Sequence, residues 1–197
     1  MVSNFLIVLL MLTSLSYIIF LVLLFIFYSS GFVSIISGAP YIPLSQKLIR
    51  KILSFGGLSS NDVFYDLGCG DGRILISGLS NFNVSKAVGY EVAPWPYFKT
   101  LFLIKRNRFK KIDLFRKNCL KADIGQATFI YLYLFLKLVD KVAYKIATNG
   151  TPGAKILCVE FPIDTNQHIE FQLLKSEKID NLMVYLYELK PPAIHFK

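Results

Sequence analysis

Residues 63–76, VFYDLGCGDGRILI, place three glycines within five positions directly after an apolar run. Glycine has no Cβ atom, so a loop this rich in glycine lets its backbone come close to another group. Four candidates for that group are a dinucleotide, a nucleoside triphosphate, another small cofactor, or only a neighbouring helix. The spacing of the glycines and the acids beside them separate these candidates.

The loop does not have the spacing of the common phosphate-binding motifs. No GK[ST] follows it, as a P-loop would require, and Gly70 and Gly72 are two residues apart where the GxGxxG fingerprint needs three. Two acids flank the glycines, Asp66 before the first of them and Asp71 within the loop. Two carboxylates would repel a pyrophosphate, but they would attract a cation or accept hydrogen bonds from an ammonium group and hydroxyls.

A third acid, Glu91, ends the next predicted strand, 25 residues after Asp66. An acid at this place in a nucleotide-binding sheet can accept hydrogen bonds from both ribose hydroxyls. S-Adenosylmethionine has these groups: it is a sulfonium nucleoside with a free amino-acid end and no phosphate. The sequence therefore predicts an S-adenosylmethionine site.

The chain after residue 57 alternates strand and helix patterns, which predicts a Rossmann-like, doubly wound α/β fold with a mostly parallel sheet. We expect an antiparallel hairpin at the C-terminal end, turning at Asp180-Asn181. In such sheets, ligands bind beyond the carboxyl ends of the strands. The predicted strands are 63–67, 86–91, 112–117, 128–135, 154–161, 171–179 and 182–189, and the predicted helices are 73–79, 96–106 and 136–148.

The N-terminal part of the chain is uncharged and strongly apolar. No charged residue or histidine precedes Lys47, and residues 5–28 are almost entirely apolar. Twenty-four helical residues span about 36 Å, which exceeds a hydrocarbon core of roughly 30 Å. The run is too long for a cleaved signal peptide and no basic residue precedes it. We predict a single-pass transmembrane anchor, with the basic residues that follow it placing the C-terminal domain in the cytoplasm.

Between the anchor and the sheet, we expect a linker that includes a short amphipathic helix. Ser45 is its predicted cap, and Gly56-Gly57 its predicted end. Its basic face either rests on the bilayer or is only solvated. The predicted organisation is therefore an anchor at 1–28, a linker at 29–57 and a catalytic domain at 58–197.

The net charge of +9 belongs to the part of the chain that follows the anchor, and it favours anionic membrane lipid as a partner. The densest basic cluster is 103–111, LIKRNRFKK, which is either a lipid or acidic-partner contact or a solvated helix end. The basic residues form no recognised nucleic-acid-binding motif, so no nucleic-acid partner is expected. Cys69, Cys119 and Cys158 form no CxxC pair, so neither a disulfide framework nor a metal site is expected.

Several motifs together resemble a known family. DLGCGDGR (66–73) resembles motif I of class I S-adenosylmethionine-dependent methyltransferases, and VGYEVAPW (88–95) resembles the ribose-binding segment that follows it. GAPYIP (38–43) and VEFPI (159–163), in the same order along the chain, are similar to a narrower group. That group is the small membrane-anchored protein-lysine methyltransferases related to the ATP synthase c-subunit lysine methyltransferase.

The resemblance implies a role for particular residues. Matched by position, Asp66, Gly68, Cys69, Gly70 and Gly72 form the loop at the methionine end of the cofactor, and Glu91 holds the ribose. The family usually has an Asp that meets the adenine amino group, whereas this chain has Asn118 or Cys119 there. Asn118 can still hydrogen-bond adenine through its amide. The resemblance places adenine recognition at one of these two positions, where this chain departs from the usual Asp of the family.

For the methyl acceptor, aromatic side chains near the ends of the fourth and fifth strands are candidates. Tyr131, Tyr133 and Phe161 either line a substrate channel or are ordinary core aromatics, and Tyr41 either closes over the site or packs the linker. In-line methyl transfer needs no covalent nucleophile, so no single catalytic residue is predicted.

Three functions fit these features. The first is methylation of a lysine in a membrane-associated protein. The second is methylation of a lipid or small hydrophobic molecule, and the third is S-adenosylmethionine binding without catalysis.

Overall fold

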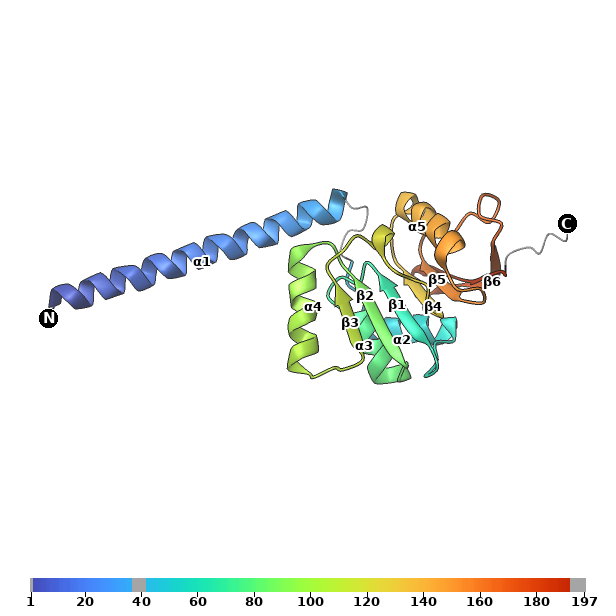
Figure 1. Cartoon of the computed structure of the whole chain (residues 1–197), viewed down its shortest axis with the longest axis horizontal. Coiled ribbons are helices and arrows are strands. Elements are labelled where there is room, and N and C mark those ends of the chain that lie inside the picture. The colour runs from blue at the N-terminus through green and yellow to red at the C-terminus, as the bar shows by residue number, and fades with distance from the viewer. Residues whose placement is uncertain (1, 37–41, 192–197) are drawn as a thin grey trace.

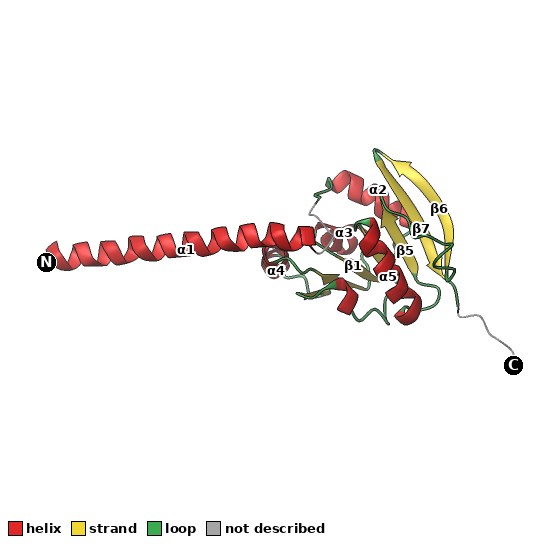
Figure 2. Cartoon of the chain, turned by 90° about the horizontal axis from the view of Figure 1, so that it is seen from above, coloured by secondary structure: helices red, strands yellow, loops and turns green. Residues whose placement is uncertain are grey.

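The computed structural model describes residues 2–36 and 42–191, with the side chains of residues 4–29 and 42–191. A long N-terminal helix extends away from an α/β domain, and the chain enters that domain next to its sheet (Figures 1 and 2). The helices are α1 (Val2–Ile36), α2 (Gln46–Gly56), α3 (Arg73–Phe82), α4 (Pro94–Arg106), η1 (Cys119–Lys121, a 3₁₀ turn) and α5 (Leu136–Asn149). The strands are β1 (Val63–Leu67), β2 (Lys86–Tyr90), β3 (Ile112–Phe115), β4 (Phe129–Leu132), β5 (Lys155–Val159), β6 (Phe171–Ile179) and β7 (Leu182–Leu189).

The seven strands form one sheet in the order β3-β2-β1-β4-β5-β7-β6. The first five are parallel, while β7 is antiparallel to both β5 and β6. The predicted doubly wound, mostly parallel sheet with a C-terminal hairpin is therefore confirmed. The strand order reverses between β1 and β4, which places the topological switch point at the carboxyl ends of these two strands.

Helices cover both faces of the sheet, and each face has its own apolar cluster. On one face, α5 buries Val139, Val142 and Ile146 against β1, β4 and β5. On the other face, α2, α3 and Ile104 of α4 pack over Phe64 and neighbouring residues of the sheet. The site at the strand ends is consequently set on a rigid scaffold.

Helix α2 has the predicted caps and is packed as part of the domain. The Ser45 hydroxyl accepts a hydrogen bond from the Leu48 N–H at 3.2 Å, and Gly57 ends the helix in the left-handed conformation. Its apolar side chains Ile49, Ile52 and Leu53 are fully buried in the core. The basic face points outward, where Lys51 pairs with Asp180 at 2.6 Å. The apolar face of α2 thus contacts the sheet and not a bilayer.

Helix α1 is longer than the predicted anchor. It continues to Ile36, eight residues beyond the expected end at Tyr28, into the segment predicted as linker. The one glycine there, Gly31, costs a helix only about 1 kcal/mol relative to alanine, so it does not end the helix. By length and composition, residues Asn4–Ser29 are long and apolar enough to cross a membrane.

Candidate functional site

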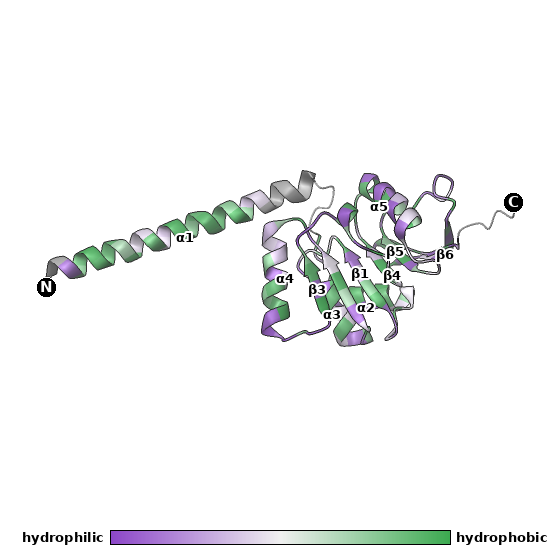
Figure 3. Ribbon diagram, in the orientation of Figure 1, coloured by the Kyte–Doolittle hydropathy of each residue, from purple (hydrophilic) through white to green (hydrophobic). Residues whose placement is uncertain are grey.

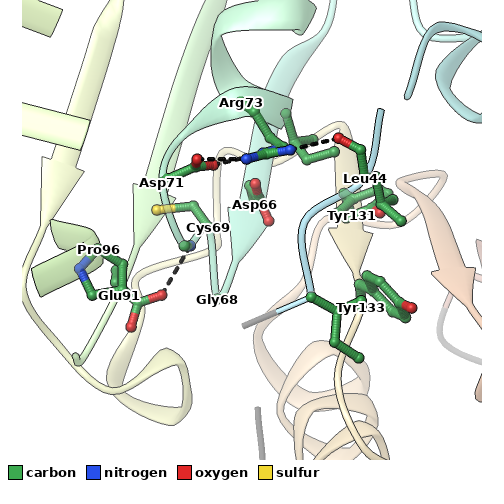
Figure 4. Close-up of a pocket in the computed structure, with 13 residues that line it drawn as sticks. Leu44, Asp66, Gly68, Cys69, Asp71, Arg73, Glu91, Pro96, Tyr131 and Tyr133 are labelled. Atoms are coloured by element: carbon green, nitrogen blue, oxygen red, sulfur yellow. Dashed lines mark hydrogen bonds and ion pairs between the residues drawn. The ribbon is translucent and has the colours of Figure 1, made fainter. Parts of the chain in front are cut away.

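A pocket opens at the carboxyl ends of β1, β2 and β4, beside the switch point of the sheet (Figure 4). The glycine loop forms one side of it, and the segment that leads into α2 forms the opposite side. The lining residues are Ile42, Leu44, Asp66, Gly68, Cys69, Gly70, Asp71, Arg73, Ile74, Glu91, Pro96, Tyr131 and Tyr133. The structure therefore brings the loop, Glu91 and two of the predicted aromatic residues to one place.

The glycine loop is fixed by its own backbone. The N–H groups of Gly68 and Cys69 both donate to the Tyr90 carbonyl, at 2.9 and 3.0 Å. Gly72 has φ +75°, and a Cβ atom there would lie less than 3.0 Å from Thr100. The Thr100 hydroxyl in turn donates to the Gly70 carbonyl at 2.9 Å. Gly72 is thus required by its close packing against α4. Gly68 and Gly70 line the pocket with backbone atoms alone.

Glu91 is buried with its carboxylate held by two backbone donors. Its Oε2 atom accepts from the Gly70 N–H at 2.9 Å, and its Oε1 atom accepts from the Ala93 N–H at 2.7 Å. Burial raises the pKa of Glu91, and these hydrogen bonds oppose that rise. A carboxylate oxygen accepts more than one hydrogen bond, so both oxygens retain capacity for a second donor. This geometry suits a vicinal diol, whose two hydroxyls would approach the two oxygens.

Asp66 lies at the end of β1 and points into the pocket (Figure 4). Within the described part of the chain, its Oδ2 atom and the Tyr131 hydroxyl are both buried without a hydrogen-bond partner. The two residues are opposite each other in the β1–β4 register. Burial raises the pKa of Asp66, with further increases from the charges of Glu91 and Asp71. An unsatisfied buried polar group costs about 1–3 kcal/mol, so a ligand with several N–H donors is favoured here.

Asp71 binds cations of the protein itself. Its carboxylate accepts two hydrogen bonds from the Arg73 guanidinium, at 2.8 and 2.7 Å, and one from Lys99 at 2.9 Å. The Arg73 guanidinium also donates to the Leu44 carbonyl at 2.6 Å (Figure 4). The sequence predicted that both acids attract a cation or accept hydrogen bonds from an ammonium group and hydroxyls. For Asp71, the cations are Arg73 and Lys99 of the protein itself. Asp66 is therefore the loop acid whose unmet hydrogen bond faces the pocket.

A second, smaller pocket continues from the first and shares Gly68 and Glu91 with it. Its lining residues are Gly68, Tyr90, Glu91, Val92, Lys117, Asn118, Cys119, Leu134 and Leu138. The Asn118 side-chain oxygen accepts from the Leu120 N–H at 2.9 Å and so caps η1. Burial raises the pKa of the Cys119 thiol to about 11, which keeps it neutral. The mostly apolar lining and the Asn118 amide fit a flat heterocycle such as adenine.

The predicted substrate-channel residues divide into three groups. Tyr131 and Tyr133 both line the main pocket. Phe161 does not line it; its ring packs against Phe135, with 5.8 Å between the centroids. Tyr41 lies outside the described residues. Cys69 lines the pocket, but burial raises the pKa of its thiol well above the usual value, so it is not a thiolate nucleophile.

Other lining residues were not predicted from the sequence. Leu44 and Ile42 reach the pocket from the segment before α2, and Pro96 reaches it from α4. Thr100 does not line the pocket, but it fixes the loop from the buried side of α4. A polar residue on the buried stripe of a helix is a signal that could have identified Thr100. The position of Leu44 carries no such signal, because it depends on how the chain enters the domain.

S-Adenosylmethionine fits these residues. Its amino group would supply donors beside Asp66, its ribose hydroxyls would face Glu91, and its adenine would reach the second pocket. A dinucleotide fits less well, because the loop lacks the GxGxxG spacing of dinucleotide-binding proteins and the Asp66 carboxylate, which faces the pocket, would repel a pyrophosphate.

Comparison with known proteins agrees with this geometry. The model of the ANTKMT methyltransferase domain matches residues 66–170, which is more than half of the chain. A protein-lysine N-methyltransferase of Saccharolobus islandicus is 33% identical over 131 residues, covering 66% of this chain and 81% of that protein. The ATP synthase c-subunit lysine N-methyltransferase of Xenopus laevis is 25% identical over 129 residues. That match covers 62% of this chain and 54% of the frog protein.

Among solved structures, an RNA methyltransferase of Salinibacter ruber in complex with S-adenosyl-L-homocysteine has the same fold. The two superimpose with a TM-score of 0.70 at 22% identity, over 79% of this chain and 98% of that one. At this identity the likeness shows the fold alone. The family model, which matches more than half of the chain, shows that this chain belongs to the ANTKMT methyltransferase family; with the lysine methyltransferase relative and the shared fold, it identifies the chain as an S-adenosylmethionine-dependent methyltransferase.

Proposed function

We propose that α1 anchors this methyltransferase in a membrane and that the enzyme methylates a lysine of a membrane-associated protein, with its domain on the cytoplasmic side. One observation carries the proposal: Ile42 and Leu44, which line the pocket, lie only a few residues after the apolar helix in the sequence. Only residues 37–41 separate Ile42 from the end of α1 at Ile36. At about 3.6 Å per residue, this stretch reaches at most about 22 Å. The pocket therefore stays close to the end of the anchor, where a lysine beside a bilayer can reach it.

The names of the relatives support a lysine acceptor. The archaeal relative is a protein-lysine N-methyltransferase, and the frog relative is named for a lysine of the ATP synthase c-subunit. The basic residues Lys47, Arg50 and Lys51 follow α1 and are exposed, which agrees with a cytoplasmic domain under the positive-inside rule.

Within this proposal, the residues of the pocket bind and orient. When bound, S-adenosylmethionine supplies an electrophilic methyl group on its sulfonium. Glu91 accepts hydrogen bonds from the ribose hydroxyls, and Asp66 accepts from the amino group. Gly68 lines both pockets, and its lack of a side chain lets the cofactor pass close to the backbone between them. Fixing the reacting groups in line accounts for much of the rate enhancement that this type of transfer requires.

Tyr131 and Tyr133 form the wall where the acceptor enters. The lysine must arrive as a neutral amine, and removal from water into an aromatic pocket lowers the pKa of its ammonium group. The Tyr131 hydroxyl is buried and has no partner within the described residues, so it can bind the amino group of either the acceptor or the cofactor. Burial, followed by the charge of Asp66, raises the pKa of Tyr131, which keeps the phenol protonated as a donor.

The test is to incubate the purified full-length protein with membranes and S-adenosylmethionine that carries a radiolabelled methyl group. Label in a protein band, recovered as methyl-lysine after hydrolysis, supports the proposal. Label in the lipid extract would replace it with lipid methylation, and binding without transfer would replace it with a non-catalytic cofactor-binding role.

A pair of variants makes this test specific to the pocket. Glu91→Ala removes the proposed ribose contact and should weaken cofactor binding, and transfer with it. Glu177→Ala is the matched control, because this glutamate is exposed on β6, away from the pocket. Equal binding by the wild type and Glu91→Ala would contradict the ribose assignment.

A further inference from the structure

The outward face of α4 carries three exposed aromatic side chains. Trp95, Phe98 and Phe102 are 43%, 47% and 61% exposed, and their spacing puts them on one stripe of the helix. The opposite face of α4, with Pro96, Thr100 and Ile104, is buried in the domain. Three large aromatic rings in a row on a surface helix form an apolar ridge that indicates a contact with something other than water.

The segment of the chain that carries this ridge is rich in basic residues. Residues 92–117 contain eight of the 22 lysines and arginines but a single acid, Asp113, which pairs with Lys86 at 2.7 Å. The Arg116 guanidinium lies 6.0 Å from the centre of the Phe98 ring. We use the name α4 surface for Trp95, Phe98 and Phe102 together with the exposed basic residues Lys105, Arg106, Arg116 and Lys117. This surface combines aromatic rings with concentrated positive charge.

The α4 surface lies beside the candidate anchor. Helices α1 and α4 are in contact, and the rings of Phe27 and Trp95 meet edge to face with 6.1 Å between their centres. In Figure 1, α4 lies at the side of the domain from which α1 extends, and it runs across the direction of α1. Figure 3 shows apolar residues along α4 and a hydrophilic end, where Lys105 and Arg106 lie. With α1 across a bilayer, α4 would lie along the bilayer surface.

We propose that the α4 surface docks on anionic lipid and so fixes the orientation of the catalytic domain; this rests on the proposed anchoring by α1. Aromatic rings are favoured at the level of the lipid headgroups, and basic side chains are attracted to anionic lipid. The charge and the direct contact with α1 favour a lipid surface over an acidic protein as the occupant. Docking holds the domain in one orientation, so that the pocket reaches acceptors at a constant depth.

Trp95 is the only tryptophan of the chain, and it belongs to the docking surface. The experiment uses the full-length protein in lipid nanodiscs that contain acyl chains brominated near the headgroup, which quench nearby tryptophan. One set of discs contains phosphatidylcholine alone, and the other also contains phosphatidylglycerol. The proposal predicts stronger quenching of Trp95 in the anionic discs, and loss of that difference at high salt because salt screens the attraction.

Two double variants, each with two positive charges removed, test whether the quenching depends on the α4 surface or only on the net charge of the protein. Lys105→Gln with Arg106→Gln should lower the docking equilibrium by about thirtyfold, since each charge near an anionic surface contributes about fivefold. Lys137→Gln with Lys141→Gln removes the same charge from exposed positions on α5 and should leave the quenching unchanged.

Equal quenching in the neutral and anionic discs, or equal loss in the two double variants, would overturn the proposal. Quenching that appears only after an acidic protein is added would assign the surface to a protein partner and overturn it as well. A failure of anchoring is distinguishable, because the protein would then not co-purify with the discs. If the enzyme does not methylate a protein lysine, the quenching result is unaffected, because the quenching does not depend on methyl transfer.

Discussion

The packing of Gly72 against Thr100 gives a prediction whose size follows from the structure. Gly72 has φ +75°, and a Cβ atom there would lie less than 3.0 Å from the Thr100 methyl group, on a side chain that is fully buried. The left-handed conformation costs a residue other than glycine about 1–2 kcal/mol, and overpacking costs about 1–3 kcal/mol. Gly72→Ala should therefore lower the free energy of unfolding by about 2–5 kcal/mol.

The assay is thermal unfolding of the full-length protein in detergent, followed by the fluorescence of Trp95. For a domain of about 150 residues, each kcal/mol lowers the melting temperature by about 2–4 °C, so a fall of about 4–20 °C is expected. Gly125→Ala is the control, because the nearest atom to its added Cβ would be 3.7 Å away. We expect that control to change stability by less than about 0.5 kcal/mol.

A double variant tests the cause of the loss. Thr100→Ser removes the methyl group and retains the hydroxyl that donates to the Gly70 carbonyl. Added to Gly72→Ala, it should recover part of the loss, because residues in contact usually couple by about 0.5–3 kcal/mol. Melting of Gly72→Ala within about 1 °C of wild type, or no recovery in the double variant, would refute the reasoning.

Three further predictions concern the pocket. Burial raises the pKa of Asp66 in the folded state, so this residue favours the ligand-free fold at low pH. That contribution to stability is lost as the pH rises above about 4, the pKa of the residue in the unfolded chain. In Asp66→Asn, the melting temperature should therefore fall less as the pH rises. Tyr131→Phe removes a buried hydroxyl that has no hydrogen-bond partner among the described residues, so the melting temperature should stay equal or rise while the rate of methyl transfer falls. A lower melting temperature would instead show that the hydroxyl stabilises the fold. Asn118→Asp keeps the acceptor for the Leu120 N–H and should bind S-adenosyl-L-homocysteine in calorimetry, whereas Asn118→Leu should bind it several-fold more weakly.

Much of the fold follows from local pattern. The bounds of β1, β6 and β7 agree with the prediction to the residue, because each run of strand-forming residues ends at a clear turn or loop. The convergence of the glycine loop with Glu91 was also predictable, because parallel strands place their carboxyl ends at the same edge of a sheet.

The parts that escaped prediction depend on contacts between distant segments. Leu44 meets Arg73 across 29 positions of sequence, and Thr100 meets Gly70 across 30. Phe161 is a different case: β5 ends at Val159, so strand alternation no longer decides where the next side chains point. Its ring lies with the cluster under α5, whereas Tyr131 belongs to the cluster on the other face of the sheet.

The contact between Arg73 and the Leu44 carbonyl has a consequence for how this enzyme can be divided. A shortened protein that begins at α2, chosen to remove the apolar helix and gain solubility, would also remove Ile42 and Leu44 from the wall of the pocket. It would deprive Arg73 of its 2.6 Å acceptor, while Asp71 would still hold the other side of the guanidinium. The pocket of such a protein would lack one wall, so weak activity measured on it would say little about the intact enzyme. The shortest version that preserves the site begins before Ile42.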